Sequence, residues 1–144
     1  KTPTLSEEVL THYRKVPEKD KSTKYSIADH SEYLQGEILD LFHLIRNRIL
    51  NLDPTVKEEY KKLYIAYKTT TNFIDIVPQR SRLRLSLNMA FDEINDPQGI
   101  CKNITNLGRW GNGDVEVAFA SSTEIDYVMF LIQQSFDMHS EDIG

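Results

Sequence analysis

The chain has 144 residues, the length of one domain, and it can bury a hydrophobic core without help from a metal or a disulfide. Hydrophobic residues make up 40% and charged residues 27% of the chain, and the formal net charge of -5 argues against non-specific binding of nucleic acid. One cysteine, Cys101, excludes an intrachain disulfide and indicates a reducing, cytoplasmic compartment. No apolar run reaches the roughly 20 residues of a membrane span.

Polar residues dominate the beginning of the chain, and residues 1–28 are predicted to be a linker or a short helical extension. The region 29–137 has the pattern of a single α+β domain, and residues 138–144 are predicted to be a frayed tail. The first residue is Lys1 rather than Met. We therefore expect either the C-terminal piece of a longer protein or a processed chain.

Two amphipathic helices are expected, one before and one after the strands along the chain. Between residues 29 and 52, apolar side chains recur every three or four positions, which is the period of one helix face. A last helix is predicted over Ser121–Phe136, where Ser121 and Glu124 have the spacing of a capping box. The segment Asp96–Gly108 is predicted to be a short helix or helical turn, because Asp96 suits its cap and Gly108 its end.

Alternation of apolar and polar side chains predicts four strands between these helices. Ser81–Met89 is the clearest, since its leucines face one way and its polar residues the other; the remaining strands are Tyr60–Lys68, Asn72–Pro78 and Asp114–Phe119. The short connections indicate an antiparallel meander. The predicted fold is therefore α+β, a small antiparallel sheet of about four strands with a long N-terminal helix and a C-terminal helix packed on one face.

Three segments, YKTTTNFIDIVPQRSRLRLSLNM, INDPQGICKNITNLGRWGNGDVEV and EIDYVMFLIQQSF, resemble a bacterial and archaeal domain of unknown function. Many members of that family carry the label "predicted transport protein". The resemblance covers about residues 29–137. It implies an accessory module, since similar modules lie at the C-terminal end of longer chains, some of them with nuclease-like domains or in proteins similar to modification-dependent restriction enzymes. The family has no established catalytic residues, so the resemblance assigns none here.

Three arginines, Arg80, Arg82 and Arg84, recur at every second position around the clearest strand. On one strand face their guanidiniums would lie about 7 Å apart, roughly the spacing of successive phosphates on a nucleic-acid strand. Lys68 is expected nearby on a neighbouring strand. The alternative is a solvated sheet face on which the arginines pair with acids across strands, namely Asp75, Glu116 or Glu58.

The loop GRWGNGD contains the only tryptophan, Trp110, beside Arg109. A partly exposed indole next to a guanidinium could stack on a base or another planar group. The alternative is a structural corner, in which Trp110 covers the helix–sheet seam and glycines let the backbone pass close by. Asn112-Gly113 is a turn signal, and the loop lacks the spacing of a nucleotide-phosphate cradle.

Patterns for catalysis or metal binding are weak. The carboxylates Asp75, Glu116 and Asp114 lack the Asp…Glu-x-Lys spacing of a nuclease, and surface solubility is the alternative explanation for them. The histidines are scattered, with His43 expected at the edge of the core, and Cys101 is expected to pack as a small apolar group. No cofactor, metal or catalytic residue is predicted, and we expect that the domain alone is not an enzyme.

The sequence favours a non-catalytic accessory or interaction module of a DNA-processing or phage-defence protein. Its expected partners are nucleic acid or an upstream nuclease-like domain, and not a membrane. The candidate binding residues are Arg80, Arg82, Arg84, Arg109, Trp110 and Lys68.

Two alternatives stay open. One is a small-molecule or nucleotide-binding domain with a pocket between the last helix and the aromatic strand residues, which are Tyr60, Tyr64, Tyr67 and Phe73. Core packing would explain the same aromatic residues. The other alternative is a structural domain that forms a homodimer through Phe130 and Leu131, which are expected to be exposed on the last helix.

Overall fold

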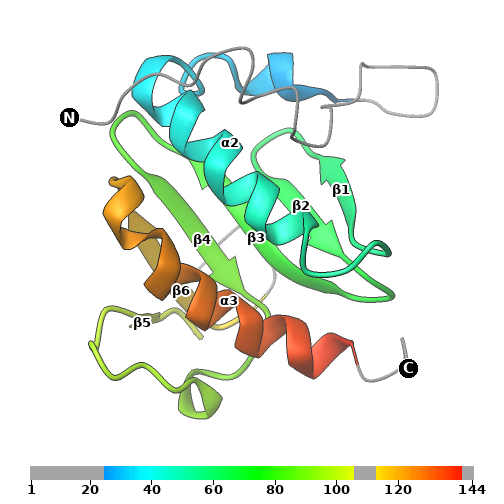
Figure 1. Cartoon of the computed structure of the whole chain (residues 1–144), viewed down its shortest axis with the longest axis vertical. Coiled ribbons are helices and arrows are strands. Elements are labelled where there is room, and N and C mark those ends of the chain that lie inside the picture. The colour runs from blue at the N-terminus through cyan, green and yellow to red at the C-terminus, as the bar shows by residue number, and fades with distance from the viewer. Residues whose placement is uncertain (1–24, 106–112, 141–144) are drawn as a thin grey trace.

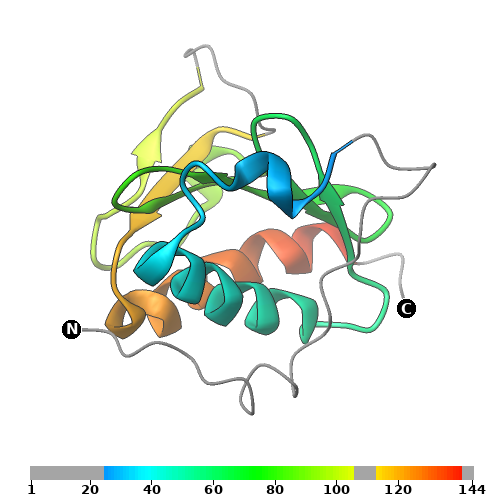
Figure 2. The ribbon, with the colours of Figure 1, turned by 90° about the horizontal axis from the view of Figure 1, so that it is seen from above.

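Two helices lie on one face of an antiparallel sheet in the computed structural model, which describes residues 25–105 and 113–140 (Figure 1, Figure 2). Helix α2 comprises Gly36–Leu50 and helix α3 comprises Ile125–His139. A short 3-10 helix precedes each of them, η1 at Ile27–His30 and η3 at Ser122–Glu124. Figure 2 shows α2 and α3 on the same side of the sheet. The predicted α+β class, with an antiparallel sheet and two helices, is confirmed.

The sheet has six strands rather than about four, in the order β1-β2-β3-β4-β6-β5, and all neighbours are antiparallel. The strands are β1 Lys57–Tyr60, β2 Ile65–Lys68, β3 Asn72–Pro78, β4 Leu83–Leu87, β5 Lys102–Asn103 and β6 Val115–Phe119. One additional strand arises because the segment predicted as a single strand is a hairpin. The Lys61 N–H donates to the Tyr64 carbonyl at 2.8 Å and closes its turn.

The other additional strand is β5, which lies in the segment predicted to be helical, Asp96–Gly108. The described part of that segment forms a turn followed by β5, and a 3-10 helix, η2 at Phe91–Glu93, comes before it. The Asp96 carboxylate accepts a hydrogen bond from the Cys101 N–H at 2.7 Å, so it holds a loop together instead of capping a helix. Pairing with β6 then extends the chain as β5.

The helices also differ at their ends from the expected ranges. The region predicted as one helix over residues 29–52 is divided into η1 and α2. Gly36 has a φ of 54°, a left-handed conformation that cannot continue a preceding α-helix, and α2 starts there. Helix α3 continues past the expected end to His139, whose imidazole lies 2.7 Å from the Asn88 carbonyl oxygen. The capping box of Ser121 and Glu124 is present as predicted.

The hydrophobic core fills the space between the sheet and the two helices. The leucines of β4 face the helices as predicted and are fully buried. Leu85 and Leu87 pair with isoleucines of β3 and valines of β6, and Leu83 pairs with Pro78 and Phe119. Tyr60, Tyr67 and Phe73 are buried too, so core packing accounts for most of the aromatic run. On α3, Phe130 is 41% exposed, whereas Leu131 is fully buried and the expectation that it is exposed is wrong.

Gly113 shows why the loop before β6 contains glycine. Its φ is 102°, and a Cβ atom at this position would lie 2.0 Å from the carbonyl oxygen of Leu87. The expectation that a glycine lets the backbone pass close by is therefore confirmed at this residue. Arg109 and Trp110, the other residues of interest in this loop, lie outside the described residues.

Candidate functional site

Polar side chains occupy the face of the sheet opposite the helices. In the middle of this face, Asp75 stands opposite Ala66 and Ser86, and Ser86 stands opposite Glu116 on β6. Arg84 lies on the same face, because it alternates along β4 with leucines that point toward the helices. This face is where the sequence analysis expected a row of arginines.

That row does not form. Strand β4 begins at Leu83, so only Arg84 of the three predicted arginines lies on a strand. Arg80 and Arg82 belong to the turn between β3 and β4, where the Gln79 N–H donates to the Arg82 carbonyl at 2.9 Å. Arg80 and Arg82 have the period-two spacing of a strand but lie in a turn. Their guanidiniums therefore do not share one strand face with that of Arg84.

The remaining cations of the sheet face are close to acids. The Arg84 Nε lies 3.8 Å from the Glu116 carboxylate, and both side chains are mostly buried. The Lys68 Nζ lies 3.7 Å from the Glu59 carboxylate. Because Lys68 pairs with Asn72 of β3 and Arg84 with Val77, the two cations lie roughly 17 Å apart along the strands. The structure does not bring them together into one site.

Asp75 is fully buried although it lies on the sheet face opposite the helices, so its interpretation as a surface residue is wrong. A buried carboxylate needs hydrogen-bond donors to offset the loss of water. The Asn72 side-chain amide supplies one of them, at 2.8 Å from Oδ1. Asp75 is thus a buried, hydrogen-bonded carboxylate in the middle of the sheet.

Two hairpin turns at one end of the sheet bring a different set of cations together. The β1–β2 turn contains Lys62, and the β3–β4 turn contains Arg80 and Arg82. The turns lie at the same end because the first residues of β2 and β4 both pair with the last residues of β3. Within the described part of the chain, none of these three cations makes an ion pair. Their charge is therefore directed to solvent.

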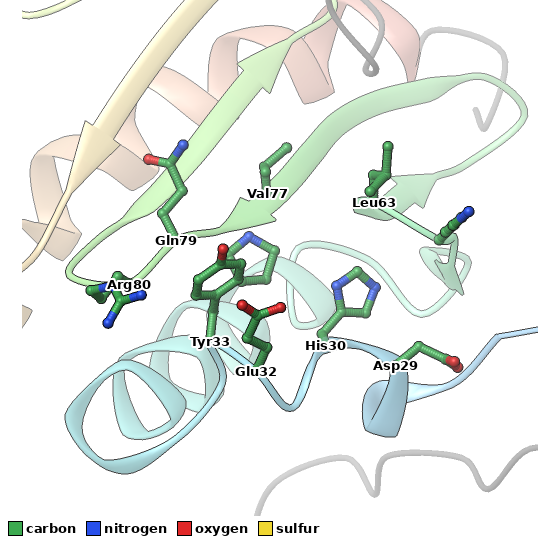
Figure 3. Close-up of a pocket in the computed structure, with 10 residues that line it drawn as sticks. Asp29, His30, Glu32, Tyr33, Leu63, Val77, Gln79 and Arg80 are labelled. Carbon is green, nitrogen blue, oxygen red and sulfur yellow. The ribbon is translucent and has the colours of Figure 1, made fainter.

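A cleft of about 440 Å³ lies between these turns and the segment that joins η1 to α2. Its polar lining residues are Asp29, His30, Glu32, Tyr33, Lys62, Gln79 and Arg80, and its apolar ones are Leu63, Val77 and Pro78. Figure 3 shows Tyr33 and Glu32 rising from that segment toward the end of β3, with Arg80 on one side and Leu63 on the other. Tyr33 is 36% exposed and Leu63 is 42% exposed, which leaves both accessible to a ligand.

His30 fixes one wall of this cleft to the β1–β2 turn. Its Nε2 lies 2.8 Å from the Lys61 carbonyl oxygen. A carbonyl only accepts, so Nε2 carries the hydrogen and Nδ1 remains an acceptor. Burial lowers the pKa of His30, outweighing the Lys61 carbonyl and the Asp29 charge, which act in the opposite direction. The imidazole is therefore neutral at pH 7.

A second polar cluster lies on the helix side of the sheet, inside the core. Arg46 of α2 donates to both carboxylate oxygens of Glu58, from Nε at 2.7 Å and from Nη2 at 3.0 Å. The Tyr67 hydroxyl donates to the same carboxylate at 2.7 Å. His43, expected at the edge of the core, is half-buried beside them; burial and then the Arg46 charge lower its pKa. Because this cluster is closed off from solvent, we assign it to the fold.

Sequence reasoning missed both the cleft and the role of His30. The contact between His30 and Lys61 joins residues 31 positions apart, so no local sequence pattern predicts it. The position of Lys62 at the same end of the sheet as Arg80 and Arg82 depends on the hairpin at Lys61–Tyr64, which was predicted to be part of a strand. A turn prediction at those residues was the one signal that would have revealed the cleft.

Over residues 25–105 and 113–140, no three His, Cys, Asp or Glu side chains are grouped so that they could hold a metal ion. In those ranges there is also no helix with the length and apolar character needed to cross a bilayer.

The fold and this cleft define a small α+β domain with a charged surface at one end of its sheet. Over residues 27–139 the chain matches the family described as "Domain of unknown function (DUF5655)", and it belongs to that family. The predicted resemblance to a domain of unknown function is thereby confirmed.

The chain is also similar to a protein of Haemophilus influenzae called "Uncharacterized protein". The two are 38% identical over 109 residues, which is 76% of this chain. The matched segment spans 35% of the length of that relative. No solved structure matches the chain.

Proposed function

We propose that this domain is a non-catalytic accessory module of a DNA-processing or phage-defence protein, and that it contacts single-stranded nucleic acid. The contact is made by the turn surface, which we define as Lys62, Arg80, Arg82 and Tyr33. The observation that carries the proposal is that two hairpin turns at one end of the sheet present three cations without ion pairs among the described residues, and two of them, Lys62 and Arg80, line a cleft with the exposed ring of Tyr33.

The chemistry of a single strand matches this surface. Lys and Arg side chains neutralise phosphates and release their counterions, and an aromatic ring stacks on any base because every base has a π face. On the sheet face, in contrast, Arg84 and Lys68 lie beside acids, so they contribute less charge to an incoming phosphate. Because the turn surface has three cations and the chain has a net charge of -5, we expect a modest affinity for single-stranded nucleic acid. This affinity should fall steeply as the salt concentration rises.

The length of the relative supports a module within a longer protein, since the matched segment is 35% of that chain. We propose an upstream nuclease-like domain as the partner and the cytoplasm as the compartment. Arg109 and Trp110, which precede β6, remain candidates for the same nucleic-acid contact.

Fluorescence anisotropy with labelled single- and double-stranded oligonucleotides tests the proposal at low salt. The test variant is Lys62→Ala/Arg80→Ala/Arg82→Ala. The control is Arg48→Ala/Lys57→Ala/Lys102→Ala, which removes the same charge from exposed positions outside the cleft. We expect the test variant to lose about tenfold or more in affinity for the single strand and the control to lose much less.

Three outcomes would contradict this proposal. Equal losses in both variants would mean that only the total charge matters. Tighter binding of the double strand would exclude base stacking as the main contact. Absence of binding by the parent protein would remove the nucleic-acid function altogether. Thermal unfolding of both variants checks that they are folded.

A second candidate function is a small-molecule or nucleotide-binding domain. The cleft volume of about 440 Å³ favours it, since ligand pockets commonly measure about 300–1,000 Å³. A ligand that binds only the folded state raises the melting temperature. Thermal-shift screening against nucleotides and metabolites is therefore the test, and a flat response across the panel would count against this function.

A third candidate function is a structural dimerisation domain. Phe130 and Met138 of α3 are exposed apolar residues, at 41% and 39%, and they favour a contact with a second copy. Light scattering during size-exclusion chromatography would give a dimer mass if this function is correct and a monomer mass if it is wrong.

A further inference from the structure

The two walls of the cleft carry opposite charge. Asp29 and Glu32 come from the segment before α2, whereas Lys62 and Arg80 come from the two hairpin turns. The Asp29 carboxylate already accepts the Ser26 N–H at 2.7 Å. The Glu32 carboxylate has no hydrogen-bond partner among the described residues, so its acceptor capacity is open to a ligand.

Gln79 supplies a donor at the same cleft. Its side-chain oxygen accepts the Arg82 Nε–H at 2.6 Å. This contact fixes the orientation of the amide, so its NH₂ group remains as a donor of hydrogen bonds. Figure 3 shows the Gln79 side chain running from the end of β3 away from Tyr33 and Glu32. The Gln79 donor therefore lies on the side of the cleft away from Glu32, and the Glu32 carboxylate is the open acceptor.

Apolar groups lie between the two charged walls. Val77 and Pro78 are buried at the end of β3, while Tyr33 and Leu63 are partly exposed. A planar ring placed against Tyr33 would gain stacking and apolar contact. A ligand that complements Tyr33, Glu32 and the two cations is planar, carries an amino group for Glu32 and bears an anionic group for Lys62 and Arg80.

A nucleotide with an exocyclic amino group has all of these features. We infer that the cleft binds one amino-bearing nucleotide, with its base against Tyr33, its amino group at Glu32 and its phosphate between Lys62 and Arg80. This inference rests on the proposed contact with nucleic acid. It specifies which kind of nucleotide the turn surface binds preferentially. The nucleotide is either free or part of a single strand, and the chemistry of the cleft is the same for both.

Matched nucleotide pairs test the selection. The base of dCMP has the amino group from which Glu32 is inferred to accept a hydrogen bond, whereas dUMP has a carbonyl oxygen in its place. Isothermal titration of the full chain is expected to show dCMP binding about fivefold or more tightly than dUMP. The same preference is expected for AMP over IMP. Deoxycytidine without a phosphate is expected to bind more weakly than dCMP, and Lys62→Ala is expected to weaken dCMP and dUMP alike.

The Glu32→Gln variant gives the decisive comparison. It is expected to bind dCMP and dUMP equally, whereas Glu37→Gln, an exposed glutamate outside the cleft, is expected to keep the preference of the parent protein. Both positions are exposed, so both variants are expected to fold, and thermal unfolding verifies this. Equal binding of dCMP and dUMP by the parent, or a preference that survives Glu32→Gln, would overturn the inference.

Oligonucleotides separate this inference from the function on which it rests. An oligonucleotide of thymines with one central cytosine is compared with an all-thymine strand, and the first is expected to bind more tightly. If both strands bind equally through the turn surface and no mononucleotide binds, the inference fails and the proposed function stands. If mononucleotides bind with the expected preference and no strand binds, the cleft takes free nucleotides and the proposed function fails.

Discussion

The Arg46 guanidinium and the Glu58 carboxylate face each other inside the protein, with side-chain exposures of only 2% and 5%. Two hydrogen bonds join them, and the Tyr67 hydroxyl adds a third to the same carboxylate. Since Arg46 belongs to α2 and Glu58 to β1, the pair ties the first helix to the edge strand that precedes the β1–β2 turn. Lys62, which lines the cleft, lies in the turn that follows this strand.

Replacing one member of this pair should destabilise the folded protein out of proportion to replacing both. We expect Glu58→Leu to lower the free energy of unfolding by about 3–5 kcal/mol, because it leaves the buried Arg46 charge without its carboxylate. The double variant Arg46→Met/Glu58→Leu should lose less than the sum of the two single variants. Urea denaturation at pH 7 measures all three. Additive losses, or a loss below about 1 kcal/mol for Glu58→Leu, would show that the pair is not coupled.

Gly113 and Gly99 form a matched pair for testing a close backbone approach. Both have positive φ, but a Cβ at Gly99 would meet nothing within 4 Å, whereas a Cβ at Gly113 would collide with the Leu87 carbonyl. We expect Gly99→Ala to cost about 1–2 kcal/mol from its left-handed conformation. Gly113→Ala should cost clearly more, because β4 or β6 must also move. Equal urea midpoints for the two variants would contradict this explanation of the loop before β6.

Stability should fall on mild acidification because of His30 and His43. Burial is the largest cause of the lowered pKa of both residues in the folded state. The unfolded chain therefore binds protons more readily, and the free energy of unfolding decreases as pH falls below the ordinary histidine pKa of about 6.5. The decrease ends once pH is below the lowered pKa of the folded state.

The variant His30→Gln/His43→Gln tests this assignment. Glutamine can still donate to the Lys61 carbonyl at position 30 but does not titrate. Urea denaturation at pH 7.5 and pH 5.5 is expected to show a loss of stability in the parent and a smaller loss in the variant. The same pH dependence in both proteins would place the titrating groups elsewhere.

Cys101 should react slowly with thiol reagents in the folded protein. Burial, followed by the hydrogen bond and charge of Asp96, raises the pKa of Cys101 to about 12. Only the thiolate is nucleophilic, so little of the reactive form exists at pH 8. Labelling with a chromogenic disulfide reagent at pH 8 should be slow in buffer and fast in urea. It should be faster for the folded Asp96→Asn variant than for the folded parent, and equal rates would contradict the role of Asp96.

The elements that the sequence predicted well are those with a long and uniform pattern. The alternation of leucines in β4 identified the face that meets the helices, and the Ser121–Glu124 capping box located the start of the last helical segment. Both signals are local, because a residue two or three positions away determines them. The described strands β3 and β6 were found for the same reason.

The features that were missed depend on contacts between distant residues. The hairpin at Lys61–Tyr64 contains neither glycine nor proline, and its alternation with the flanking residues looks like one continuous strand. Asp75 occupies a position that alternates with core residues, so its burial could not be read from the pattern around it. The cleft follows from the way in which two turns meet η1, which only the pairing of β2, β3 and β4 reveals.

Mapping the contact by NMR tests the central claim most directly, namely that the turn surface is where nucleic acid binds. A ¹⁵N-labelled full chain is titrated with a short single-stranded oligonucleotide at low salt, and the backbone amide shifts are followed. The largest changes are predicted in the turns at 61–64 and 79–82 and in the segment 29–33. Changes concentrated on α2 and α3, or no saturable change at all, would contradict the claim.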